Sequence, residues 1–188
     1  MRVALILALL SGPALAADFA QGERFYDAGQ WREATDELAP LAEQGDAKAQ
    51  FLLGAMLLDG GNGIAKDRGR AMTLLTRAAD QQHPGAIFEL YLAHHPPESL
   101  RWAERLAAQG NRLQGHNRNQ AALCAETLGL EHMRGLAVPR DAVLGRAWLG
   151  IAVDLGRSEA KPILAELDGT LTPEERAHAE ALAAKLTR

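Results

Sequence analysis

Two stretches of the chain, residues 53–67 and 128–141, repeat nearly the same residue pattern. In each, a Leu-Gly pair is followed six residues after its glycine by a second glycine, and then by an aspartate. The matching positions are Leu53, Gly54, Gly60 and Asp67 in one stretch and Leu128, Gly129, Gly135 and Asp141 in the other. Gly129 follows Gly54 by 75 residues, which is two periods of about 37 residues. A weaker copy lies between them, with Leu90 in the place of Leu53.

Self-similarity at this period is typical of stacked helix pairs. Apolar residues recur at helical spacing over residues 47–58, where they form one stripe. Few aromatic residues, together with abundant Ala and Leu, also suit close-packed helices rather than a sheet. The sequence therefore predicts an all-α fold, a right-handed α-solenoid of stacked antiparallel helix pairs.

Each unit is predicted to contain a first helix, a loop and a second helix. In the second unit Gly60 is expected to end the first helix, and Asp67 to cap the next by accepting backbone N–H bonds. Gly135 and Asp141 have these roles in the fourth unit, where Trp148 lies on the apolar stripe of the second helix. The other predicted helices include residues 19–28, 31–44, 85–94 and 120–134, and residues 111–119 are predicted to be an exposed linker.

Gly54 and Gly129 lie inside predicted helices rather than at their ends. A glycine in a helix interior costs about 1 kcal/mol relative to alanine. We expect such a residue only where a neighbouring helix comes very close, so both positions are predicted to be close-approach sites.

The first 16 residues have the features of a secretory signal peptide. Arg2 precedes a short apolar run at residues 3–10, and Ala14-Leu15-Ala16 supplies the small residues at which a signal peptidase cleaves. The alternative, a membrane helix, needs a longer run to span about 30 Å of hydrocarbon. We expect cleavage after Ala16, no membrane span in the mature chain, and an exported protein, either periplasmic or secreted.

Residues 17–157 are assigned to the repeats and residues 158–188 to C-terminal capping helices. Thr172-Pro173-Glu174-Glu175 contains the elements of a capping box with proline in the first turn. Residues 158–167 are predicted to form a short helix that Pro162 interrupts. The residues expected to face inward on the last helix are Ala177, Ala181, Ala184 and Leu186.

The composition excludes some partners and some covalent links. The formal net charge of −4 gives no reason to expect nucleic acid or an anionic membrane surface. Cys124 is the single cysteine, so the chain has no internal disulfide. A small buried residue is the preferred interpretation of Cys124, with an intermolecular disulfide or a redox role as the alternative.

The repeated pattern resembles the Sel-one-like repeat (SLR) family, which is related to the tetratricopeptide repeat. The residues that carry the resemblance are Ala49, Leu53, Gly54, Gly60, Gly63, Asp67, Ala71, Ala78 and Ala79 in the second unit, and Leu128, Gly129, Gly135, Val138, Asp141, Trp148, Ala152 and Gly156 in the fourth. The resemblance implies an adaptor that binds proteins, and family members act in cell-envelope assembly, sensor-kinase regulation and host interaction. Where the family often has tyrosine, this chain has Leu57, His94 and His132.

Few features of the sequence suggest catalysis. The chain contains no Gly-x-Ser-x-Gly elbow and no Gly-x4-Gly-Lys phosphate loop. The histidines lack the three or four converging ligands that zinc requires, so neither a metal nor a cofactor is expected. We therefore predict that the protein is not an enzyme, and keep as the alternative an envelope enzyme or enzyme inhibitor, hydrolase-type and related to the cell wall.

The predicted binding surface is a groove lined by the first helices of the repeats, which would hold a protein or a peptide. His94, Glu131 and His132 are its candidate residues, because the two histidines occupy the family's tyrosine position in successive units. Imidazole supplies hydrogen bonds and a charge that changes between pH 5 and 8. In the alternative, both histidines are neutral and pack against the next helix.

Overall fold

The computed structural model describes residues 18–188, so the predicted signal peptide lies outside the described residues. The described chain contains ten α-helices, one short 3-10 helix and no strand. The elements are α1 (Phe19–Asp27), α2 (Trp31–Glu43), α3 (Ala47–Asp59), α4 (Arg68–Asp80), α5 (Pro84–Ala93), α6 (Glu98–Ala107), η1 (Gly110–Arg112), α7 (Gly115–Arg134), α8 (Ala142–Asp154), α9 (Ala160–Asp168) and α10 (Pro173–Leu186).

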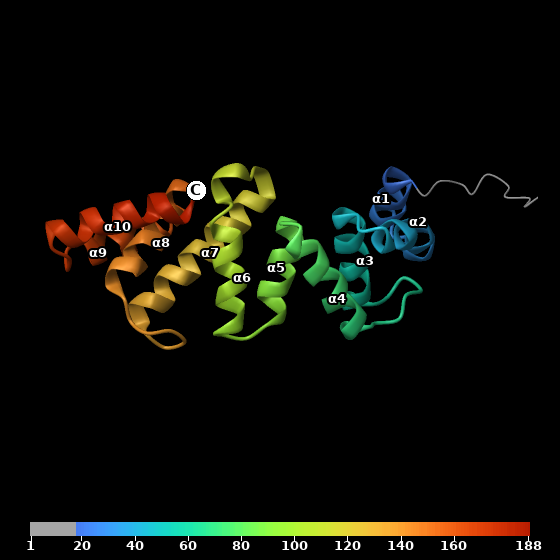
Figure 1. Cartoon of the computed structure of the whole chain (residues 1–188), viewed down its shortest axis with the longest axis horizontal. Coiled ribbons are helices and arrows are strands. Elements are labelled where there is room, and N and C mark those ends of the chain that lie inside the picture. The colour runs from blue at the N-terminus through green and yellow to red at the C-terminus, as the bar shows by residue number, and fades with distance from the viewer. Residues whose placement is uncertain (1–17) are drawn as a thin grey trace, which may run out of the picture.

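The helices stand in pairs along one long axis, from α1 and α2 at the N-terminal end to α9 and α10 at the other (Figure 1). We call the side of α1, α3, α5 and α7 the A face, and the side of α2, α4, α6 and α8 the B face. Neighbouring helices of the A face contact one another along the row, whereas contacts between neighbouring helices of the B face are sparser. The stack therefore curves toward the A face, and the predicted all-α solenoid is confirmed.

The repeat residues form the ends of the helices as expected. The side chain of Asp67 accepts a hydrogen bond from the backbone N–H of Arg70 at the start of α4. Asp141 does the same for Leu144 at the start of α8. Gly60 and Gly135 follow α3 and α7 with φ of +68° and +70°. Glycine adopts this conformation without steric cost, so both helices end where the repeat pattern places a glycine.

The mid-helix glycines lie where two helices of a pair come together. A Cβ atom at Gly54 would lie 2.9 Å from Cγ of Leu75 on α4. A Cβ at Gly129 would lie 2.6 Å from Cγ of Leu149 and 3.0 Å from the backbone oxygen of Gly145, both on α8. These distances are shorter than a carbon side chain tolerates, so close packing offsets the poor helix propensity of glycine at these positions.

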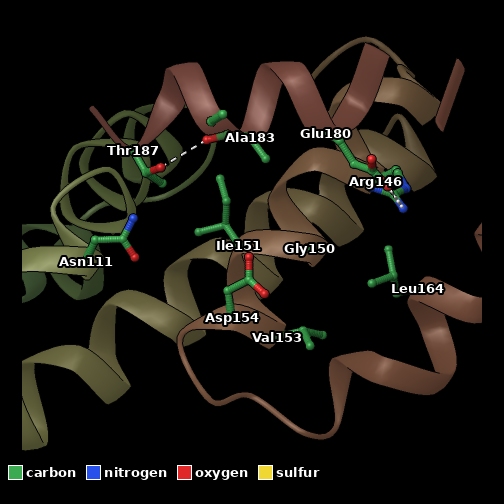
Figure 2. Close-up of a pocket in the computed structure, with 11 residues that line it drawn as sticks. Asn111, Arg146, Gly150, Ile151, Val153, Asp154, Leu164, Glu180, Ala183 and Thr187 are labelled. Atoms are coloured by element: carbon green, nitrogen blue, oxygen red, sulfur yellow. Dashed lines mark hydrogen bonds and ion pairs between the residues drawn. The ribbon is translucent and has the colours of Figure 1, made fainter. Parts of the chain in front are cut away.

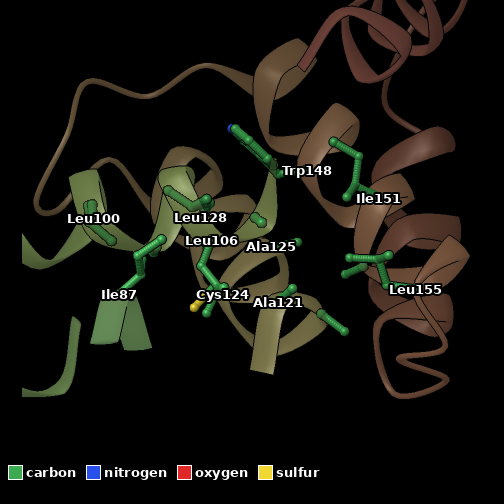
Figure 3. Packing of buried hydrophobic residues seen from close by; sticks show 14 of the residues in the cluster. Ile87, Leu100, Leu106, Ala121, Cys124, Ala125, Leu128, Trp148, Ile151 and Leu155 are labelled. Carbon is green, nitrogen blue, oxygen red and sulfur yellow. The ribbon is translucent and has the colours of Figure 1, made fainter. Parts of the chain in front are cut away.

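The core is continuous from α4 to α10, with a second cluster around α2 and α3. In the cluster that runs from α4 to α10, Trp148 is the largest fully buried side chain. It packs among leucines and alanines of α6, α7 and α8 (Figure 3). Cys124 is fully buried in the same cluster, and burial raises the pKa of its thiol to about 12. The interpretation of Cys124 as a small buried residue is confirmed.

The predicted linker at residues 111–119 is wrong. Residues 110–112 form η1, and α7 begins at Gly115, five residues before the predicted start at Gln120. The sequence of this added turn has no apolar stripe, so its helical character was not predicted. Hydrogen bonds to another helix hold the turn in place. Arg118 donates to the backbone carbonyls of Asp154 and Leu155 at the end of α8.

Two predictions for the C-terminal helices also need correction. Pro162 does not interrupt a helix, because α9 begins at Ala160 and the proline lies in its first turn, where a backbone N–H has no intrahelical partner. On α10 the inward residues are Ala179, Ala183 and Leu186, whereas the predicted residues Ala177, Ala181 and Ala184 are exposed. Alanines cover several faces of α10, so hydrophobic pattern alone does not define its rotation. The predicted capping box at Thr172 and Glu175 is confirmed.

Candidate binding site

A cleft of about 230 Å³ opens between α5, α6 and α7, in the third repeat. Tyr91 and Leu92 of α5 form one wall, and Thr127 and Glu131 of α7 form the opposite wall. The remaining lining residues come from the turn after α5 and from the start of α6, and they are His94, Pro96, Ser99 and Leu100. The cleft thus combines an apolar floor with a few polar groups, as binding sites commonly do.

The residue at the helix-crossing position lies in the wall of the cleft. Tyr91 follows Leu90, just as Gly54 follows Leu53 and Gly129 follows Leu128. A tyrosine ring cannot occupy the space of the hydrogen atom that Gly54 and Gly129 present at the crossing. The ring instead lies 5.7 Å from that of Phe88, and its hydroxyl is 3.4 Å from Oγ1 of Thr127. Tyr91 therefore bridges α5 and α7 across the cleft.

His94 occupies the C-terminal end of α5 and joins two of its neighbours. Its Nδ1 lies 2.7 Å from the carbonyl oxygen of Leu90, so this nitrogen carries the hydrogen and donates. Its Nε2 lies 3.5 Å from Oε1 of Glu98 on α6, and its ring is 6.4 Å from that of Trp102. The imidazole is thus fixed between the carbonyl of one helix and the carboxylate of the next.

The structure brings His94 and Glu131 to the same cleft, but His132 is not among the residues that line it. The backbone carbonyl of His132 accepts a hydrogen bond from the N–H of Asp141, just as the carbonyl of Leu57 accepts one from Asp67. His132 thus takes the place of the buried Leu57 within the repeat. Its Nδ1 is buried and has no hydrogen-bond partner among the described residues.

Acidic and aromatic groups also occur on other helices of the A face. Burial raises the pKa of Glu89, and the nearby carboxylate of Asp59 raises it further. Burial also raises the pKa of the Tyr26 hydroxyl, with added contributions from the charges of Asp59, Asp27 and Glu89. These residues belong to α1, α3 and α5, so ionisable groups of three successive A helices lie near one another. Leu92 of α5 is 59 % exposed.

Sequence reasoning missed most of this surface. Asp59 and Glu89 occupy different positions within their repeats, so periodicity gives no signal that they lie together. The replacement of the crossing glycine by Tyr91 was the one available signal for the cleft.

A second cleft, of about 440 Å³, lies at the C-terminal cap (Figure 2). Ile151 and Val153 of α8 face it, and α10 contributes Ala183 and Glu180. Arg146 closes one end because its guanidinium pairs with Asp168 at 2.8 Å and with Glu180 at 3.0 Å. Arg146, Asp168 and Glu180 thus satisfy one another at that end, and Asp154 of α8 also lines the cleft.

Across residues 18–188, no three or more His, Cys, Asp or Glu side chains are grouped so that they could hold a metal ion. No helix in the same range has the length and hydropathy needed to cross a bilayer.

Comparison with known families decides what the repeats are. The Sel1 repeat model matches residues 47–83, 96–111 and 122–156. The chain contains Sel1 repeats. Sel1 repeats typically mediate contacts between proteins. The outer two matches cover α3–α4 and α7–α8, whereas the middle match covers only α6 and η1. Helix α5, which carries Tyr91 and Leu92, lies outside all three matches.

A solved structure shows the same fold. A Sel1 repeat protein from Oxalobacter formigenes superposes with a TM-score of 0.64 at 21% identity, over 78% of this chain and 59% of that one. The Sel1 chain thus spans less than two thirds of that structure's length. The protective antigen c5321 of uropathogenic Escherichia coli strains, described as having an SLR fold, aligns at 24% identity over 89% of this chain and 44% of that one, with a TM-score of 0.45. No curated protein matches the sequence.

Proposed function

We propose that this Sel1-repeat protein is an adaptor that binds a segment of a protein partner on its A face, centred on the cleft of the third repeat. One observation carries the proposal. The cleft forms at the point where the chain departs from its own repeat, with Tyr91 in place of a glycine and with α5 outside the family matches. A large exposed leucine, Leu92, lies at its edge. Repeat stacks of this kind use such inner surfaces for binding.

The chemistry of the A face indicates the kind of segment that it accepts. Tyr91, Leu92 and Pro96 provide apolar contacts for one side chain of the partner. Glu131 adds a carboxylate at the cleft, and Glu89 adds one on the adjoining surface. Because burial opposes ionisation of Glu89, a positive charge brought beside it is favourable. The partner segment would therefore pair an apolar side chain with a neighbouring Lys or Arg.

Export to the cell envelope is part of the same proposal. Its support is the charged, apolar and small-residue pattern at residues 1–16. The test is the N-terminal mass of the protein purified from the periplasm or medium of a bacterial host. A mature chain that begins at Ala17 is expected, and an intact Met1 on the exported form would contradict the proposal.

The binding proposal is tested by site-specific photo-crosslinking. A photoreactive amino acid replaces Leu92 and, in a matched control, Leu136, the other large hydrophobic side chain that is strongly exposed among the described residues. Leu136 lies in the loop between α7 and α8, away from the cleft. We expect a discrete partner protein to be crosslinked from envelope extract through position 92 and not through position 136. Equal yields at both positions would mean non-specific contact and would defeat the proposal.

The two predicted histidines supply a second matched pair. His94→Ala removes a side chain that lines the cleft, whereas His132→Ala removes one that does not. We expect crosslinking through position 92 to fall in the first variant and to persist in the second. Thermal denaturation of both variants separates loss of binding from loss of fold. Equal capture by the two variants would remove His94 from the site.

A further inference from the structure

The second helix of the third repeat begins without the cap that its counterparts have. In α4 and α8 the N-cap residues Asp67 and Asp141 each accept a hydrogen bond from the backbone N–H three residues later. The N-cap of α6 is Pro97, and no side chain caps this ten-residue helix. The N–H of Leu100, which holds the equivalent position, therefore forms no hydrogen bond within residues 18–188.

Ser99 provides a second donor beside this N–H group. The residue is only 4 % exposed, and its hydroxyl forms no hydrogen bond within the described part of the chain. Ser99 and Leu100 both line the cleft of the third repeat, so the cleft is where a ligand reaches them. A buried polar group without a partner costs free energy, so a ligand that supplies an acceptor there is favourable.

The other hydroxyl groups of the cleft are already in use. Thr127 donates to the carbonyl of Leu123 at 3.0 Å, and the hydroxyl of Tyr91 lies 3.4 Å from Oγ1 of Thr127. Ser99 is thus the lining residue whose hydroxyl is left for a ligand. Together with the N–H of Leu100 it makes a pair of donors at the start of α6.

The charges around the cleft select a neutral acceptor. Glu131 is a lining carboxylate, and no lysine or arginine lines the cleft among the described residues. Glu98 adds a carboxylate at the first position of α6, opposite Nε2 of His94, and Arg101 borders a neighbouring groove instead. These carboxylates repel an anion although a helix N-terminus attracts one. The carbonyl oxygen of a peptide bond satisfies the two donors without that repulsion.

The available carbonyl also specifies the conformation of the partner. In an α-helix each interior carbonyl is bonded to the N–H four residues later, so it cannot serve a second protein as well. An extended segment has its carbonyl and N–H groups unpaired, and successive side chains point to opposite sides. Such a segment can direct a carbonyl to Ser99 while a neighbouring side chain enters the cleft.

We propose that the partner segment binds in an extended conformation, with one main-chain carbonyl oxygen accepting hydrogen bonds from the Ser99 hydroxyl and the Leu100 N–H. This inference rests on the proposed function, because it concerns the same cleft. The carbonyl takes the place of the aspartate that caps α4 and α8, so the partner supplies the cap that α6 lacks. Tyr91 and Leu92 then contact the adjoining apolar side chain, and Glu131 pairs with the Lys or Arg.

The test measures binding of a fluorescein-labelled peptide, Gly-Gly-Leu-Lys-Gly-Gly with both ends blocked, by fluorescence anisotropy. Ser99→Ala should bind it about fivefold more weakly, as expected for one lost hydrogen bond. The matched control is Ser158→Ala, which changes the other serine of the described chain, an exposed residue far from the cleft in sequence. The control should bind like the unmodified protein. The melting temperature of Ser99→Ala should not fall, because the hydroxyl has no partner in the free protein, whereas a structural role would lower it.

The carbonyl is tested by replacing each main-chain oxygen of the peptide in turn with sulfur, a weaker acceptor. At one position the replacement should weaken binding to the unmodified protein about fivefold, and it should have little effect on Ser99→Ala because the two changes remove the same bond. A peptide with the same leucine and lysine, held helical by a side-chain staple, should bind more weakly than the extended one.

Equal affinity of Ser99→Ala and Ser158→Ala for the peptide would overturn this inference. So would a sulfur scan with no sensitive position, equal binding of the stapled helix, or no binding of the peptide at all. In each of these cases, crosslinking of an envelope protein through position 92 and not through position 136 would leave the A-face proposal standing. Binding of the peptide that depends on Ser99, without crosslinking through position 92, would defeat the adaptor proposal alone.

Discussion

The helix pairs α3–α4 and α7–α8 differ from the pair α5–α6 that stands between them. The first two cross at Gly54 and at Gly129, where the opposite helix comes too close for a side chain. The third has Tyr91 at that position and leaves a cleft of about 230 Å³. We call the second and fourth repeats closed, because their crossings leave no room for a side chain, and the third repeat open.

The turns within the pairs differ in the same way. In the second and fourth repeats a glycine ends the first helix and an aspartate caps the second, so local sequence defines both ends. In the third repeat α5 ends at His94 in extended backbone, and α6 begins after Pro97 without a side-chain cap. A contact from another helix lies at this turn, because Arg68 of α4 donates to the carbonyl of Ala93 at the end of α5. The third repeat therefore depends more on its neighbours.

The largest expected effect comes from filling a closed crossing. Gly129→Leu places a side chain against Leu149 and against the backbone oxygen of Gly145, which cannot move without shifting α8. Overpacking of this kind should reduce the free energy of unfolding by about 3 kcal/mol. Chemical denaturation of the variant and of the unmodified protein measures the difference.

Gly150→Ala is the matched control for this substitution. Gly150 also lies within α8, but no atom lies within 4 Å of the Cβ position. Alanine should therefore stabilise the helix there by about 0.5–1 kcal/mol. An unchanged stability for Gly129→Leu would show that the crossing glycines do not hold the pairs together.

A smaller effect is expected when the open repeat is given the residue of the closed ones. Tyr91→Gly removes the ring packed between α5 and α7 and adds glycine to a helix interior. We expect a loss of about 2–3 kcal/mol, because α5 and α6 were built around the ring and do not close onto the glycine. Tyr91→Phe removes only the 3.4 Å contact with Thr127, so its effect should stay within about 1 kcal/mol. A stabilised Tyr91→Gly would mean that the tyrosine serves binding alone.

The closed repeats were predictable and the open one was not. The glycines that end helices, the aspartates that cap them and the crossing glycines all act within one repeat. Residues such as Gly60 and Asp67 therefore determine the local structure around them. The start of α7 was missed because Arg118 holds it through carbonyls of α8 that follow 36 residues later. The coupling of Asp59 with Glu89 was missed for the same reason, since only the stacking of repeats brings them together. The candidate site lies where these contacts between units dominate.

The smallest expected effect concerns the first residues of α5 in the open repeat. The N-cap of this helix is a titratable residue. His83 is the N-cap of α5: its Nδ1 accepts a hydrogen bond from the N–H of Ala86, and its ring stacks on Phe51 at 4.6 Å. Burial lowers the pKa of His83 below its ordinary value of 6.5, and the charge of Lys48 lowers it further, although Asp46 opposes this shift. Protonation also removes the lone pair that accepts the cap bond.

Because its folded-state pKa is the lower one, His83 takes up its proton more readily in the unfolded chain. Its contribution to stability is therefore complete above pH 6.5 and declines as the pH falls below that value. His83→Asn keeps a good N-cap that does not titrate. Between pH 7 and pH 5 the unmodified protein should lose more stability than the variant, by an amount no larger than a lost cap, about 1 kcal/mol. Thermal unfolding of both proteins across this range measures the difference. The other histidines are common to both proteins, so their contributions cancel in the comparison. Parallel curves of stability against pH would show that the cap on α5 does not respond to pH.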